Sequence, residues 1–76
     1  MEEISAILKS IRPEFDFAGV SDFFARGMLD SLDLTVLVST LEEKYGLVID
    51  GADIVPENFR NIEAINSLLR KYTAAV

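Results

Sequence analysis

The feature that most constrains the fold of this chain is the helical spacing of its apolar residues in three separate segments. These segments span residues 2–11, residues 31–45 and residues 62 to about 73. Within each segment the apolar residues recur at intervals of three and four, which predicts a helix with one buried face. The predicted buried faces are Ile4, Ile7, Leu8 and Ile11; Leu34, Leu37, Val38, Leu41 and Tyr45; and Ile62, Ile65, Leu69 and Tyr72.

Residues suited to helix ends bound the three predicted helices. Pro13 ends the first helix, because a proline and the residue before it disfavour its continuation. Asp30 suits the N-cap of the second helix, and Gly46 suits the left-handed residue that follows that helix. Asn61 suits the N-cap of the last helix. The end signals therefore agree with the spacing of the apolar residues.

The connection between the first two helices, residues 12–29, is long and rich in aromatic residues. It has no sustained period, and its large apolar residues are Phe15, Phe17, Val20, Phe23 and Phe24. So many phenylalanines are unusual in a solvated loop, and long loops often carry structure or function of their own. We therefore expect several of these rings to pack into the helical bundle.

The connection before the last helix is expected to be mostly irregular. Residues 47–49 are too few to assign from periodicity, and residues 51–55 are predicted to hold one helical turn. Pro56 is expected to break whatever precedes it. Residues 57–60 are predicted to be a connection in which Phe59 points inward.

Length and composition favour a single helical domain over residues 1–76. A chain of 76 residues buries only about 60% of its unfolded surface, so its core must be well used. Half of the residues are hydrophobic, and the absence of cysteine and histidine excludes a disulfide or a Cys/His metal site. The prediction is an all-α fold: a small four-helix bundle of three long helices and a short third one, with the long first loop wrapping one end.

The charge and the apolar runs exclude some classes of partner. A net charge of −6 opposes nucleic-acid binding and suits basic protein partners, although it could equally serve only solubility. No run approaches the roughly 20 apolar residues that span a bilayer, and the acidic Met1-Glu2-Glu3 start is unlike a signal peptide. The lack of cysteine fits a reducing compartment. We expect a soluble, cytoplasmic, monomeric protein without membrane insertion.

The candidate functional residue is Ser31, which stands at the start of the second predicted helix. Serine is common there because it caps well, and taken alone Ser31 fits that role. Asp30 already provides a cap, however, which leaves the Ser31 hydroxyl free, close to helix N–H groups that favour a phosphate ester. The only lysines, Lys9, Lys44 and Lys71, lie far from Ser31 in sequence, and there is no histidine. A serine nucleophile needs a base, so a hydrolase is not expected. We expect instead that another enzyme modifies Ser31.

The outer face of the second helix adds a possible docking surface beside Ser31. At about 100° per residue, this face carries Leu32, Val36, Ser39 and Glu43. Isolated surface aliphatics are common, so Leu32 and Val36 fit either an ordinary helix surface or a partner-binding patch. No metal site is expected: residues 50–53 lack the alternating ligands of a calcium loop.

With Asp30-Ser31-Leu32 at the start of the second predicted helix, the chain resembles the acyl carrier proteins and the closely related peptidyl and D-alanyl carrier proteins. The resemblance covers nearly the whole chain. It rests on the run Gly-Met-Leu-Asp-Ser-Leu at residues 27–32, on residues 37–38 and 41–46, on Ile49, and on Val-Pro-Glu-Asn-Phe at residues 55–59 leading into Ile62.

This resemblance implies a cofactor, partners and roles for named residues. Ser31 would receive 4'-phosphopantetheine from coenzyme A through a separate phosphopantetheinyl transferase that uses Mg²⁺. The terminal thiol would then carry an acyl or aminoacyl group as a thioester, delivered by an activating ligase and used by synthase enzymes. Asp30 would help the transferase hold its metal, and Leu32, Asp33 and Val36 would contact partner enzymes. The inward-facing residues of the second and last helices could open to accept an acyl chain.

Two departures from the family pattern keep the pathway open. Leu29 stands where many fatty-acid carriers have alanine, and Val36 where they have an acidic residue. These departures argue against a role as the general carrier of fatty acid synthesis. Residues 28–29 and 55–59 look more like those of free-standing carriers used with adenylating ligases, or of peptidyl carriers. We expect an acyl carrier for fatty acid, polyketide or related biosynthesis, with an aminoacyl, peptidyl or D-alanyl carrier served by an adenylating ligase as the alternative. A helical interaction module without a prosthetic group is a further alternative, and no catalytic activity is expected in any case.

Overall fold

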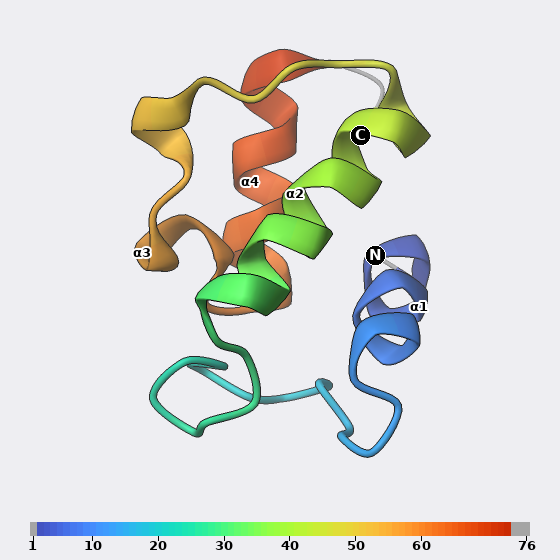
Figure 1. Ribbon diagram of the computed structural model, residues 1–76, viewed down its shortest axis with the longest axis vertical. Coiled ribbons are helices and arrows are strands. Elements are labelled where there is room, and N and C mark those ends of the chain that lie inside the picture. Colours follow the sequence, from blue (N-terminus) through green and yellow to red (C-terminus); the bar gives the residue numbers. More distant parts are fainter. Residues whose placement is uncertain (1, 74–76) are drawn as a thin grey trace.

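The computed structural model describes residues 2–73, and all regular elements among those residues are helical. Figure 1 shows four α-helices and one short 3-10 helix: α1 (Glu2–Ile11), α2 (Ser31–Tyr45), η1 (Gly51–Asp53), α3 (Pro56–Phe59) and α4 (Ile62–Tyr72). The predicted all-α, four-helix architecture with a short third helix is therefore confirmed. Met1, part of the acidic start noted in the sequence, lies outside the described residues.

The three long helices pack through the faces that their periodicity predicted. α1 contacts both α2 and α4, and α3 contacts α4. The long first connection runs beneath the N-terminal end of α2 in the view of Figure 1. The core is one cluster of buried apolar residues to which all three long helices contribute; its largest fully buried side chains are Phe23, Phe59, Ile4, Leu8, Leu37, Leu41, Ile65 and Leu69.

The aromatic residues of the first connection fill one end of the bundle, as predicted. Phe23 is fully buried and packs edge-to-face on the buried Phe17, with 5.0 Å between ring centroids. The backbone N–H of Phe23 donates to the carbonyl of Arg60 at 2.6 Å. The side-chain amide of Asn61, the N-cap of α4, donates to the carbonyl of Ser21 at 3.0 Å. The loop is therefore anchored to the junction of α3 and α4.

The prediction of an irregular segment at residues 57–60 is wrong. The helical turn predicted within residues 51–55 is present as η1, but a second helix, α3, begins at Pro56. Proline interrupts a helix interior, yet it favours the first helical position, because its φ is already helical and its missing N–H would have no partner there. Pro56 therefore starts α3, and this short helix delivers Phe59 to the core.

Among the helices of residues 2–73, none has both the length and the apolar character that a bilayer crossing requires.

Candidate functional site

The start of α2 is fixed by a reciprocal pair of side-chain bonds. Asp30 is the N-cap, and its Oδ1 accepts the backbone N–H of Asp33 at 2.9 Å. Asp33 returns the bond, because its Oδ2 accepts the backbone N–H of Asp30 at 3.2 Å. Such a capping box satisfies N–H groups that have no partner within the helix. The predicted cap at Asp30 is confirmed, and the return bond from Asp33 extends it.

Ser31 occupies the first residue of α2, and its side chain faces solvent. Its backbone carbonyl accepts the hydroxyl of Thr35 at 3.1 Å. Within residues 2–73, no protein group forms a hydrogen bond with the Ser31 hydroxyl. Because Asp30 serves as the cap, Ser31 is not needed for that purpose. The hydroxyl is thus exposed and available to an external reagent.

The chain reaches Ser31 through a buried and tightly turned segment. Gly27 adopts the left-handed conformation, with φ at 71°, which is costly for other residues. The next two residues, Met28 and Leu29, are buried in the core. The backbone N–H of Met28 donates to the carbonyl of Phe23 at 2.8 Å. These contacts fix the position of the serine, although its hydroxyl forms no hydrogen bond within residues 2–73.

A guanidinium from the far side of the first connection completes the site. The Nε of Arg12 donates to Oδ2 of Asp33 at 2.9 Å, and its NH2 lies 3.6 Å from Oδ2 of Asp30. Its NH1 also donates to Glu14 at 3.1 Å. Arg12 therefore ties the end of α1 to both members of the capping box.

The hydrogen bonds of this cluster shift the pKa values of its charged groups. The pKa of Asp30 is lowered, chiefly because its carboxylate accepts the N–H of Asp33, with a further contribution from the charge of Arg12. The pKa of Arg12 is raised, first by its hydrogen bond to Asp33. Asp30 and Arg12 are therefore charged at neutral pH, and the charge of Arg12 favours the ionised form of Asp30.

The predicted partner-binding residues fall into two groups. Leu32 and Val36 are 73% and 44% exposed, so the outer face of α2 presents apolar side chains beside Ser31. The side chain of Asp33, in contrast, is only 14% exposed and its carboxylate is engaged in the capping box. The side chain of Asp30 is 61% exposed, although its carboxylate also takes part in the capping box.

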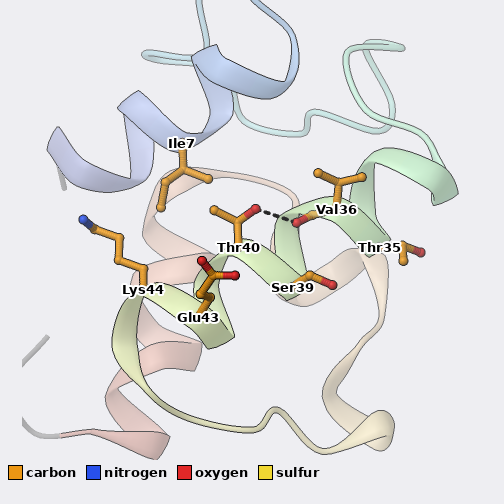
Figure 2. A pocket seen from close by; sticks show the side chains of 7 residues that line it. All are labelled: Ile7, Thr35, Val36, Ser39, Thr40, Glu43 and Lys44. Atoms are coloured by element: carbon orange, nitrogen blue, oxygen red, sulfur yellow. Dashed lines mark hydrogen bonds between the residues drawn. The ribbon is translucent and has the colours of Figure 1, made fainter.

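A shallow groove separates this face of α2 from α1. Figure 2 shows Ile7 of α1 on one side and Val36, Thr40 and Lys44 of α2 on the other. The hydroxyl of Thr40 donates to the carbonyl of Val36 at 2.8 Å, so it is satisfied within the helix. The groove has a volume of about 610 Å³, and Val36 is among the side chains that line it.

The sequence analysis missed the contribution of Arg12 to this site. Arg12 and Asp33 are 21 positions apart, and the long first connection hid their proximity. The only local signal was a lone cation directly after a predicted helix, close to Pro13.

An exposed hydroxyl at a fixed helix start, in a small bundle with an apolar helix face beside it, is compatible with one class of protein: carriers that bear a group attached by another enzyme. The chain belongs to the phosphopantetheine attachment site family, whose model matches residues 2–69. No curated protein and no solved structure matches the chain.

Family membership establishes the prosthetic group. The chain is a carrier of covalently bound 4'-phosphopantetheine, as the resemblance implied. Carrier domains of this family in general work with a phosphopantetheinyl transferase and with synthases or ligases.

Proposed function

We propose that Ser31 is the attachment residue and that the chain serves as an acyl carrier without catalytic activity of its own. One observation carries this proposal: the exposed Ser31 hydroxyl has no hydrogen-bond partner among residues 2–73 and stands at the first residue of α2. The neighbouring Asp30 performs the capping that would otherwise occupy it. We further propose that residues 1–76 act together as one carrier domain.

The start of α2 fits a phosphodiester. The first N–H groups of a helix of this length favour an anion, and the exposed serine leaves space for one. When bound, the prosthetic group supplies the thiol that this cysteine-free chain lacks. The chain has no histidine to deprotonate Ser31, so the transferase must take the hydroxyl proton while the serine oxygen attacks the pantetheine-bearing phosphorus of coenzyme A. The pyrophosphate bond of coenzyme A breaks in this step, and adenosine 3',5'-bisphosphate leaves.

The cargo is proposed to be an acyl group held as a thioester on that thiol. The residues that were expected to line an acyl site are all buried in the core: Leu34, Leu37, Val38, Leu41, Phe59, Ile62 and Ile65. A long chain would need these residues to separate, whereas a short one would not. Their packing supports the second candidate, an aminoacyl or peptidyl carrier loaded by an adenylating ligase.

Partner enzymes are proposed to dock on the face of α2 that carries Leu32 and Val36. These two side chains expose apolar surface within the first two turns after the attachment residue. Asp30 lies at the edge of this face, and Asp33 is expected to act mainly through the capping box, because little of its side chain reaches solvent.

The test is the intact mass of the protein after incubation with coenzyme A, Mg²⁺ and a broad-specificity phosphopantetheinyl transferase. We expect the wild-type chain to gain one phosphopantetheine and the Ser31→Ala variant to gain none. Ser39→Ala is the matched control, because Ser39 is also an exposed serine of α2, and it should be modified like the wild type. Modification of folded Ser31→Ala would contradict the assignment. Failure of several transferases to modify the folded wild-type chain would also contradict it, and would favour an interaction module without a prosthetic group.

A further inference from the structure

Arg12 is held where it can act on the charge around the attachment site. It follows α1 directly, and its backbone N–H donates to the carbonyl of Leu8 at 3.0 Å, which fixes its main chain. Its half-buried side chain then spans to three carboxylates, those of Glu14, Asp30 and Asp33. A guanidinium suits this role, because its planar set of donors can serve several oxygens at once.

The two carboxylates nearest Ser31 in sequence are consequently engaged. Oδ2 of Asp33 is shared between Arg12 and the backbone N–H of Asp30. Oδ1 of Asp30 accepts the N–H of Asp33, and its Oδ2 lies 3.6 Å from Arg12. The α2 face beside these groups carries the exposed aliphatic residues Leu32 and Val36.

The position of Arg12 weakens the electrostatic attraction between the carboxylates beside Ser31 and a basic partner. Free carboxylates attract a basic surface, and that attraction steers association and weakens as salt is added. A cation already fixed among the carboxylates offsets part of that attraction before any partner arrives. The apolar side chains of α2 then provide a larger share of the recognition.

On the basis of the proposed modification of Ser31, we infer that Arg12 is a specificity-determining residue of this carrier. It masks Asp30 and Asp33, so that the transferase engages the start of α2 through Leu32 and Val36 more than through the acidic groups. Removing the guanidinium leaves the charge of these carboxylates without a fixed counter-cation and makes recognition by a basic transferase surface stronger and more dependent on salt.

The test is kcat/KM for transfer of phosphopantetheine from coenzyme A to the full chain, measured at several ionic strengths. Between about 0.01 M and 1 M ionic strength, the Debye length falls from about 30 Å to about 3 Å, which removes long-range attraction. We expect Arg12→Gln to raise kcat/KM by roughly two- to fivefold at the lowest ionic strength, as one exposed charge allows. The Arg12→Gln and wild-type values should converge at the highest ionic strength.

Lys9→Gln is the matched control, because it changes the net charge equally. Lys9 is exposed on α1, and its ammonium donates to the carbonyl of Phe15 at 3.3 Å. This variant should keep the salt dependence of the wild type. Arg12→Lys, which retains the charge, should also keep it, and serves as the test if Arg12→Gln loses its helical circular dichroism.

Three results would overturn the inference. They are a parallel shift in Arg12→Gln and Lys9→Gln, a fall in kcat/KM for Arg12→Gln at every ionic strength, and a steeper salt dependence in Arg12→Lys. If the wild-type chain takes up no phosphopantetheine, the proposed function itself fails and this inference fails with it. That outcome is distinct, because no rate would then exist to compare.

Discussion

The two ends of α2 are both held by polar contacts, but only the start of the helix presents an exposed hydroxyl beside those contacts. At its start, Arg12 and the capping box fix the backbone and leave Ser31 exposed without a partner among residues 2–73. Beyond its end, Tyr72 of α4 donates its hydroxyl to Asp53 and accepts the backbone N–H of Asp50, which fastens the following loop. Polar contacts thus leave a hydroxyl exposed at one end of α2 and secure a connection at the other end.

This difference indicates where function and stability separate in the molecule. Near the end of α2, Gly46 closes the helix in the left-handed conformation, and the Glu42 carboxylate accepts the N–H of Ile49 at 2.8 Å. These bonds lie at the end of α2 opposite to Ser31. Changes at the far end should therefore alter stability alone, whereas changes at the start should also alter modification.

The largest effect is expected for Asp30→Ala. Loss of a helix N-cap should lower Tm by about 4–8 °C in a domain of this size. Modification should slow as well, because Ser31 can then take over the cap and its hydroxyl becomes engaged. Thermal unfolding and the rate of mass gain measure the two effects.

Asp50→Ala is the matched control for that change. Asp50 caps η1 at the far end, where its Oδ1 accepts the N–H of Ala52 at 2.8 Å. It should lower Tm while leaving the modification rate at the wild-type value. Equal slowing in Asp30→Ala and Asp50→Ala would remove the distinction between the two ends.

A smaller effect is expected for Tyr72→Phe. This change deletes the hydroxyl that joins Asp53 to the backbone of Asp50 and leaves the ring in place. Loss of a hydrogen-bonded hydroxyl should lower Tm by roughly 3–6 °C. The modification rate should not change, and a rate that fell with Tm would show that the far end also shapes the attachment site.

The dependence of stability on pH should also separate the two ends. The pKa of Asp30 is lowered, chiefly by the N–H of Asp33, and the pKa of Asp53 is lowered, chiefly by the hydroxyl of Tyr72. A lowered carboxyl pKa contributes stability that is present above the unfolded value of about 3.9 and is lost as the pH falls through the folded value. Both ends should therefore weaken in acid.

Between about pH 9 and pH 12 the far end should weaken, whereas Arg12 at the start of α2 stays charged because its pKa is raised. The pKa of Tyr72 is raised, first by its bond to Asp53, so its contribution is complete below the unfolded value of about 10 and is lost as the pH rises through the folded value. Unfolding of wild type and Tyr72→Phe between about pH 9 and pH 12 measures this. The variant should show a smaller alkaline loss, and equal losses would contradict the assignment.

The smallest effect on stability is expected for Leu32→Ala. Leu32 is exposed, so the free energy of unfolding should change by no more than about 0.5 kcal/mol. The kcat/KM of the transferase should nevertheless fall by about fivefold or more, because an apolar contact residue is lost. Val48→Ala is the control, since Val48 is 81% exposed beyond the far end of α2, and it should change neither quantity.

Local signals made the helices and the cap predictable from the sequence. α2 combines an apolar period with Asp30 before it and Gly46 after it, and all three features lie within one short stretch. The short third helix was expected within residues 51–55 and not at Pro56–Phe59, because Pro56 fits both a helix break and a helix start, and only the packing of Phe59 decides between them.

The long-range contacts of the site could not be predicted in the same way. The bond between Arg12 and Asp33 depends on the path of the first connection, which has no sequence period. The bond between Tyr72 and Asp53 likewise joins residues 19 positions apart. The position of Ser31 followed from local sequence, whereas the charges that surround it required the structure.

The central claim is tested most directly by locating the prosthetic group in the modified wild-type protein. Cleavage after Arg26 and Lys44 releases residues 27–44, a peptide that holds both Ser31 and Ser39. Fragmentation of this peptide by mass spectrometry should place the phosphopantetheine on Ser31. Its presence on Ser39, or on any other peptide, would contradict the account.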